Sequence, residues 1–368
     1  MPRLLSFIGG AFLAFALIAA PASAKTLFVD DNGLDCQQAT FTSVQAAVTA
    51  AGPNDTVKVC NGTYAEQVLI DNKDGLKLEG LNKDGAVIRY PATSTNDEHS
   101  LIQISDSDKV ALRFLTVSGP YVNAGCTEPE DNHLAVFVDN SFDVKIEHNE
   151  IVDIRNSLPS LYGCQDGIAV SVGDSAQDSS GSADVRHNEI TGYQKGGVLV
   201  DNTGSDARVS HNTISAAEDV QPFIAPNGVQ VSNGASARVD HNEVTENIYG
   251  PSTIGDYAGT GILLYQPKVG GVRVSQNEVY RNDDGISSYD SDGQRIEQNN
   301  SNDNRVYDGL FFDADSEGNL VLGNDATGNN EDDCHDDSNG TGTAGTANTW
   351  RNNTGNTENR EGLCKPAN

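Results

Sequence analysis

Three residues of the sequence stand out as candidate catalytic groups because each adjoins a short apolar segment. Asp283 and Asp284 precede the segment "GIS", and Lys195 precedes "GGV". A pair of carboxylates can act as general acid and base, and a lysine amine can act as a base that removes a proton. The sequence therefore offers Asp283 and Asp284 as a candidate acid–base pair and Lys195 as a candidate base.

Two clusters of acidic residues have the hard oxygen ligands that calcium prefers. They are "DDGISSYDSDG" at 283–293 and "EDDCHDDSNG" at 331–340, and neither follows the twelve-residue spacing of an EF-hand loop. We predict Asp290, Asp292, Asp332 and Asp333 as calcium ligands, and calcium is the only cofactor expected.

Four histidines each precede an asparagine in a recurring segment, as in "VRHNEI" at 185–190. They are His148, His187, His211 and His241. A column of histidines can bind copper or zinc, and the alternative is that they are ordinary exposed turn residues.

The recurring segment defines a repeat. Its asparagines stand at irregular intervals of 22 to 39 residues, with an apolar residue two positions later in the first five copies. Between them recur "DGIAVSV", "GGVLVDN", "NGVQVSN", "TGILLYQ", "DGISSYD" and "DGLFFDA", each a turn followed by a short alternating strand. The asparagines are Asn149, Asn188, Asn212, Asn242, Asn277, Asn299, Asn324 and Asn352.

Repeats of this length, made of short strands without long helices, indicate a solenoid. The fold class expected is all-β, a parallel β-helix of about ten to twelve coils. Each asparagine would lie about 4.8 Å above its equivalent in the previous coil, the distance between neighbouring strands, so that the side-chain amides form a continuous hydrogen-bonded ladder inside a bend. We therefore interpret these asparagines as structural.

The ends of a solenoid expose strand edges and need caps. Residues 41–51 show helical periodicity, with Thr40 or Thr42 as N-cap, and we expect an N-terminal capping helix there. Six cysteines in an exported chain indicate three disulfides. If sequence neighbours are also neighbours in space, the pairs are Cys36–Cys60, Cys126–Cys164 and Cys334–Cys364.

The first 24 residues are typical of a secretory signal peptide. Arg3 is followed by an apolar run over 4–20 and by the small residues of 22–24, and the alternative is a retained membrane anchor. We expect a secreted or periplasmic monomer with no membrane span after cleavage. Residues 25–368 would form a single domain, divided into an N-terminal cap with the first strands, the coils and a C-terminal cap at 25–65, 66–330 and 331–368.

The formal net charge of −30 disfavours nucleic acid and anionic membranes as partners. It also repels polyuronates unless a divalent cation bridges the two. The alternative reading of this acidity is solubility alone.

The stretch "FTSVQAAVTAAGPNDTVKVCNGTYAEQVLI" resembles the start of the pectin-lyase-like right-handed parallel β-helix superfamily, and the asparagine repeats resemble its coils. The resemblance implies a substrate lying along the strand that contains "GI". Alternation would point Ile168 and Val170 inward and Ala169 outward. The substrate-binding residues expected on this outward face are Asp201, Gln230, Tyr265, Tyr289, Phe311, Asp313 and His133.

The function predicted is binding or processing of a polysaccharide or cell-surface glycan, by a lyase-like or glycosidase-like enzyme. Asp283 and Asp284 resemble the paired aspartates of polygalacturonases, but the Gly-His-Gly and Arg-x-Lys elements are missing, as is the Asp-Pro-His motif of alginate epimerases. Two alternatives stay open. One is a non-catalytic binding scaffold, and the other is a periplasmic metal-accessory protein, because the repeats also resemble those of the NosD type.

Overall fold

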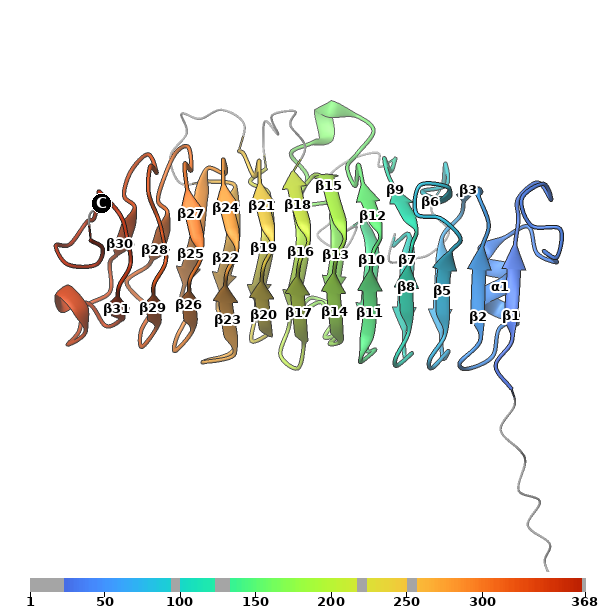
Figure 1. The fold of residues 1–368 in the computed structure, drawn as a ribbon, viewed down its shortest axis with the longest axis horizontal. Coiled ribbons are helices and arrows are strands. Elements are labelled where there is room, and N and C mark those ends of the chain that lie inside the picture. The colour runs from blue at the N-terminus through green and yellow to red at the C-terminus, as the bar shows by residue number, and fades with distance from the viewer. Residues whose placement is uncertain (1–22, 94–99, 123–132, 217–223, 250–256, 366–368) are drawn as a thin grey trace, which may run out of the picture.

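The computed structural model describes residues 23–93, 100–122, 133–216, 224–249 and 257–365. In these parts the chain consists of short strands, one α-helix and two 3-10 turns. The strands form three sheets that run side by side along the long axis, with the N-terminal strands at one end and the C-terminal strands at the other (Figure 1). Every pairing between strands is parallel, and successive strands of each sheet come from successive coils. The fold is a parallel β-helix.

The first sheet has twelve strands. They are β1 (Thr26–Val29), β2 (Thr56–Val59), β5 (Lys77–Gly80), β8 (Ala111–Arg113), β11 (Val144–Glu147), β14 (Ser182–Arg186), β17 (Asp206–Ser210), β20 (Ser236–Asp240), β23 (Val272–Ser275), β26 (Arg295–Glu297), β29 (Leu320–Leu322) and β31 (Thr349–Arg351).

The second sheet has ten strands and contains the "GI" segments. They are β4 (Val68–Asp71), β7 (Ile102–Ser105), β10 (Leu134–Asp139), β13 (Ile168–Val172), β16 (Gly196–Asp201), β19 (Asn227–Ser232), β22 (Thr260–Tyr265), β25 (Asp284–Tyr289), β28 (Leu310–Phe312) and β30 (Cys334–Asp336).

The third sheet has nine strands. They are β3 (Gly62–Ala65), β6 (Ala86–Arg89), β9 (Thr116–Ser118), β12 (Glu150–Val152), β15 (Glu189–Tyr193), β18 (Thr213–Ala216), β21 (Glu243–Thr245), β24 (Glu278–Tyr280) and β27 (Asn300–Asn302).

The inward side chains of the three sheets form one continuous apolar core from Val29 to Cys364. Equivalent positions stack from coil to coil, as Val198, Val229 and Ile262 do in the ten-stranded sheet. Because successive strands differ by one coil, a side chain in the core touches the same type of residue above and below it. This explains the strict recurrence of Val and Ile in the repeats.

The predicted asparagine ladder is present and runs from Asn149 through Asn324. From Asn188 onward, each side-chain oxygen accepts the backbone N–H and the side-chain amide of the asparagine one coil earlier, at 2.9–3.1 Å. The last member is Asn353, which accepts from Asn324. The prediction of Asn352 was wrong by one position, because Asn352 has the positive φ of the residue that precedes each ladder asparagine.

Two further ladders were not predicted. Asn247, Asn282, Asn304 and Asn329 link side chain to side chain at 2.9–3.2 Å, at the corner that follows the nine-stranded sheet. A shorter series of Gln294, Asn319 and Asn348 satisfies buried backbone groups before the twelve-stranded sheet. All three corners of the later coils are therefore held by amide side chains.

The one helix, α1 (Val44–Ala50), lies beside β1 and β2 at the N-terminal end (Figure 1). Val44, Ala47 and Val48 are buried in the common core. The helix is shorter than predicted, and Ser43, rather than Thr40 or Thr42, is the N-cap, since its side chain accepts the N–H of Ala46.

At the other end, Trp350 packs into the core and donates its indole N–H to Asp336 at 2.7 Å. The disulfides Cys36–Cys60 and Cys334–Cys364 are both formed. Cys126, half of the third expected pair, and the segment 1–22 lie outside the described residues. No helix within the described ranges is long and apolar enough to cross a membrane.

Candidate functional site

The first residue of β13, β19, β22 and β25 faces outward, which the sequence analysis did not foresee. The glycine that follows turns toward the core: a Cβ on Gly261 would meet the Val279 side chain at 2.3 Å. At the same position Ala169 is buried in the core, while Ile168 joins a small apolar cluster outside it. The predicted directions of Ile168 and Ala169 were therefore reversed.

This reversal creates a column of outward polar residues at the start of the ten-stranded sheet. Pairing of Asn227 with Thr260, and of Thr260 with Asp284, puts them in register on consecutive strands. Asp308 and Asp332 continue the column. Asp308 lies two residues before Leu310, which pairs with Ile286, and Asp332 lies two residues before Cys334, which pairs with Leu310.

A cleft of about 590 Å³ opens over the C-terminal half of this column. Its walls come from the starts of β19, β22 and β25, from the turn before β28 and from β30, together with the ends of two long loops. The residues that line it are Lys195, Ala225, Asn227, Tyr257, Ala258, Thr260, Leu263, Asp284, Tyr289, Tyr307, Asp308, Phe311, Glu331, His335 and Asp337.

Asp284 is buried in the cleft, with 4% of its surface exposed, the same fraction as for Asp308. It accepts the hydroxyl of Ser287 at 2.5 Å and the N–H of Gly285 at 3.0 Å. Burial, together with the negative charge of Asp308, raises the pKa of Asp284 to about 7. A substantial fraction of this carboxyl is therefore protonated at neutral pH and can donate a proton.

The charge of Asp308 is matched by His335. The Nδ1 atom of His335 lies 3.3 Å from the Asp308 carboxylate, and its Nε2 atom lies 3.2 Å from Asp337. Burial acts to lower the pKa of His335, but the carboxylates of Asp308 and Asp337 outweigh it and raise the pKa to about 9. At neutral pH an imidazolium thus sits beside Asp308.

Lys195 enters the cleft from the start of β16. Its Nζ donates to the carbonyl oxygen of Ala225 at 2.9 Å, and burial lowers the pKa of Lys195 to about 8. Lys195 also lines a neighbouring hollow of about 220 Å³ with Gln230 and Leu199. Of the three predicted catalytic residues, Lys195 and Asp284 line the same cleft.

Asp283 is turned away from the cleft. Its carboxylate accepts the backbone N–H groups of Tyr249 at 2.5 Å and Gly259 at 3.1 Å, and burial raises the pKa of Asp283. Asp283 therefore fixes the backbone at Tyr249 and Gly259. Asp284, next to it in the sequence, faces the cleft.

Aromatic rings cover the floor and rim of the cleft. Tyr289 and Phe311 lie with their ring centroids 5.2 Å apart, and Phe311 lies 5.1 Å from the His335 ring. Tyr265 is paired in register with Tyr289 but does not line the cleft, and the two are 44% and 36% exposed. Exposed rings beside hydroxyl, amide and carboxylate groups can bind the apolar face and the hydroxyls of a sugar.

The remaining predicted binding residues do not line the cleft. The Asp201 carboxylate is used internally, accepting from Ser232 at 2.7 Å, and Asp313 accepts hydrogen bonds at the turn after β28. His133 is buried, 4% exposed, with its ring 3.0 Å from Asp166.

The four predicted calcium ligands are dispersed. Asp290 and Asp292 belong to the turn after β25, and the Asp333 carboxylate is occupied by backbone N–H groups, including that of Asn356 at 2.6 Å. Only Asp332 lies in a potential metal-binding group of the described residues, with Asp308 and His335.

The predicted histidine column is present. His148, His187, His211 and His241 stack with centroids 4.8–5.0 Å apart, and Phe114 extends the stack at 5.5 Å from His148. All five have a positive φ, the bend conformation that precedes each ladder asparagine.

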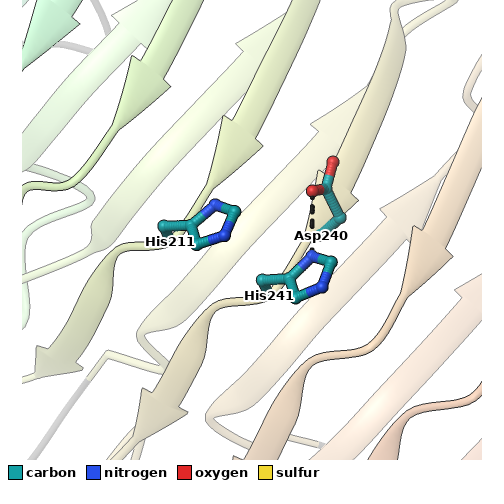
Figure 2. Close-up of side chains that lie close together, drawn as sticks. All are labelled: His211, Asp240 and His241. Atoms are coloured by element: carbon teal, nitrogen blue, oxygen red, sulfur yellow. Dashed lines mark hydrogen bonds and ion pairs between the residues drawn. The ribbon is translucent and has the colours of Figure 1, made fainter.

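Figure 2 shows His211 and His241 with Asp240, which lies 3.1 Å from the Nδ1 of His241. The ligand atoms of these three residues lie within 4.8 Å of one another, but the two rings are parallel to within 4°. Imidazole binds a metal in its ring plane, so parallel stacked rings must rotate before they can share one ion. Asp240 also pairs with Arg208 at 3.2 Å, which offsets its negative charge.

Residues 178–356 match the family model for the right handed beta helix region. This match extends over just under half of the chain and agrees with the parallel β-helix of the structure. No curated protein is significantly similar to this β-helix in sequence.

Solved structures share the fold at low identity. The complex of XylC with xylose aligns over 92% of this β-helix and 76% of that chain, with a TM-score of 0.55 and 12% identity. The alginate lyase from Paenibacillus sp. str. FPU-7 aligns over 82% of this β-helix and 94% of that chain, with a TM-score of 0.51 and 14% identity. The GH136 lacto-N-biosidase from Eubacterium ramulus aligns over 90% of this β-helix and 63% of that chain, with a TM-score of 0.59 and 12% identity. At such identities these likenesses establish the fold alone.

Sequence reasoning missed Asp308, His335, Asp337, Glu331 and Tyr307 in the cleft of this β-helix. A signal for the first was available: "DGIS", "DGLF" and "DDCH" align Asp284 with Asp308 at the same repeat position. No such signal existed for His335, because its position in the other repeats is occupied by Phe311, Ser287 and Leu263.

Proposed function

We propose that the protein hydrolyses glycosidic bonds of a polysaccharide bound along the outer face of the ten-stranded sheet. One observation carries the proposal: a carboxyl with a pKa of about 7, Asp284, lies in one cleft with a second carboxyl, Asp308, which His335 contacts at 3.3 Å. Glycoside hydrolysis requires a pair of carboxyl groups, one of which keeps a proton that it can donate.

In this mechanism Asp284 is the general acid and Asp308 the base or nucleophile. Asp284 donates its proton to the glycosidic oxygen as the bond to the anomeric carbon breaks. Asp308 either removes a proton from an attacking water or attacks the anomeric carbon itself. In both cases one water is consumed and a new reducing end is formed. Tyr289 and Phe311 would support the sugar ring beside the pair.

The charge of the cleft favours an uncharged sugar chain. Asp284, Asp308, Glu331 and Asp337 line it, against Lys195 and His335 as the cationic groups of the lining. A uronate chain would meet repulsion there. Lys195, with its pKa of about 8, nevertheless supports a second candidate, elimination from a uronate with Lys195 as base.

Known proteins of similar fold support a carbohydrate substrate, since their names refer to an alginate lyase, a lacto-N-biosidase and a complex with xylose. They do not distinguish hydrolysis from elimination.

The test is incubation of the protein with neutral and uronate-containing polysaccharides, with and without calcium. Hydrolysis gives reducing ends without ultraviolet absorbance, and the variants Asp284→Asn and Asp308→Asn should each lower the rate at least about 100-fold. Asp290→Asn, an exposed aspartate outside the cleft, is the matched control and should keep full activity.

Two results would contradict the hydrolase. Unsaturated ends that survive Asp284→Asn and vanish with Lys195→Met would establish the lyase. An absence of product with every polymer, together with unchanged binding in the variants, would favour the non-catalytic scaffold.

We further propose that the protein acts outside the cytoplasm, secreted or in the periplasm, after removal of residues 1–24. The two disulfides between described residues fit an oxidising compartment. We also assign α1 the role of a cap: it lies at the exposed first coil and buries Val44, Ala47 and Val48 over the end of the core.

A further inference from the structure

Basic residues follow one another along the outer face of the twelve-stranded sheet. In the pairing register, Arg208, Arg238, Arg273 and Arg295 occupy the same position on four consecutive strands, β17, β20, β23 and β26. Lys77 and Lys145 hold the same position on β5 and β11, separated by Ala111 of β8, and Asp184 of β14 interrupts the row between Lys145 and Arg208. These six residues are called the basic stripe below.

Acidic side chains neutralise only part of the basic stripe. Arg208 pairs with Asp240 at 3.2 Å, and Arg273 and Arg295 share Glu297 at 2.8 and 3.0 Å. Within the described residues, Arg238, Lys77 and Lys145 form no ion pair, and all three are exposed. The six cations of the stripe therefore exceed the carboxylates that pair with them.

This concentration is unexpected in a chain with a net charge of −30 and only 23 basic residues. Neighbouring strands lie about 4.8 Å apart, and like charges directly opposite one another in a sheet destabilise it. Arg238, between Arg208 and Arg273, experiences this repulsion without a carboxylate of its own. An anion bound along the stripe would relieve the repulsion.

The surface is hollowed at the N-terminal part of the stripe. A shallow depression of about 640 Å³ is lined by Lys77, Lys109, Arg113, Lys145 and Arg208. Its acidic lining residues are Asp143, Asp184 and Asp206. The depression follows the sheet across several strands, so a ligand lying in it would run along the axis of the β-helix toward Arg238.

We propose that the basic stripe binds an anionic polysaccharide chain, laid along the β-helix axis. A thin polymer fits best because the stripe is one residue wide, with acidic residues beside it, so a duplex or a membrane surface would meet the strongly negative remainder of the molecule. The row of outer positions that contains the stripe includes no aromatic residue from β1 to β26. A single-stranded nucleic acid would thus find no stacking platform.

This site is separate from the cleft. The stripe belongs to the twelve-stranded sheet and the cleft to the ten-stranded sheet, and the residues that line the cleft and the depression do not overlap. The proposal consequently holds whether or not the cleft hydrolyses a sugar chain.

The test measures binding of sodium polygalacturonate, dextran sulfate and uncharged dextran to the full protein, free of calcium, at several salt concentrations. The triple variant Lys77→Gln, Lys145→Gln and Arg238→Gln removes the unpaired cations and leaves the ion pairs intact. Its Kd for the two polyanions should rise at least about tenfold, with a weaker salt dependence. Arg89→Gln, an exposed arginine of the nine-stranded sheet, is the matched control and should stay within about twofold.

Other outcomes overturn the proposal. They are equal binding of charged and uncharged dextran, loss of affinity in Arg89→Gln as large as in the triple variant, or tighter stripe-dependent binding of single-stranded DNA or phosphatidylserine vesicles. Far-UV circular dichroism of the triple variant shows whether it is folded. Hydrolysis of a neutral polysaccharide, measured in parallel, should be unchanged in the triple variant, which separates this test from that of the cleft.

Discussion

Replacing Asp284 by asparagine should alter the pH dependence of stability in a defined way. In the folded protein the pKa of Asp284 is raised to about 7, whereas in the unfolded chain it returns to about 3.9. Between these values the folded protein keeps a proton that the unfolded chain has lost. Stability due to this group is therefore fully present below about pH 4 and declines as the pH rises through 7.

The size of the effect follows from the shift. About three pH units separate the two pKa values, and each unit corresponds to about 1.4 kcal/mol. The wild-type protein should thus lose about 4 kcal/mol between pH 4 and pH 8 through Asp284 alone. Asp284→Asn is uncharged at every pH and escapes this loss, so the difference in unfolding free energy should grow in favour of the variant across that interval.

Urea unfolding followed by far-UV circular dichroism at intervals from pH 4 to pH 9 measures this difference. A difference in unfolding free energy that is the same at every pH reports altered hydrogen bonding to Ser287 and Gly285. A difference that changes with pH reports the proton bound by Asp284. Asp290→Asn, exposed and outside the cleft, should follow the wild type throughout. Parallel curves for wild type and Asp284→Asn would refute the raised pKa and, with it, the role of Asp284 as general acid.

Three further predictions concern other groups. Asn242→Ala should lower the unfolding free energy by about 2–5 kcal/mol, because Asn212 loses its acceptor in a buried bend; a loss below about 1 kcal/mol in urea unfolding would contradict the structural role of the ladder. Cys36→Ser with Cys60→Ser opens a 24-residue link and should remove about 3 kcal/mol; thermal unfolding, with reduced wild type as control, measures it. With its pKa lowered to about 8, Lys195 should make the wild type more stable as pH rises from 8 to about 10.4; Lys195→Met should lack that rise, and an identical rise in both would count against the buried lysine.

The fold could be predicted because the repeat pattern directly indicates stacked coils. A buried asparagine between apolar residues, followed by a strand of alternating Val and Ile, has few solutions other than stacked coils, and the intervals between Asn188, Asn212 and Asn242 vary only through loops. The sequence could not reveal that Asn353, rather than Asn352, ends the ladder. Two adjacent asparagines both fit the pattern there, and only the backbone φ distinguishes them.

The site was less accessible to prediction for two physical reasons. Strict alternation put Ala169 outward, but Ala169 and Val170 are both buried in the core and Ile168 points out instead. This break in the alternation puts Asp284, at the position of Ile168, into the cleft. His335 lies 27 residues from Asp308 in the chain, and the two meet only because one coil separates them. Gln230, Tyr289 and Phe311 were placed on the outer face correctly, since they lie after this break.

The asparagine ladder also gives the molecule a polarity. Every link has its donor in the earlier coil and its acceptor in the later one, from Asn149 to Asn353, so the side-chain amide dipoles add head to tail along the axis. Extra coils could be spliced after Asn353 only if their first asparagine presents its oxygen backward. Coils inserted ahead of Leu115, which donates its N–H to Asn149, would need the same orientation. Growth of this architecture by duplication is thus directional, and an inverted copy would leave buried amides facing each other.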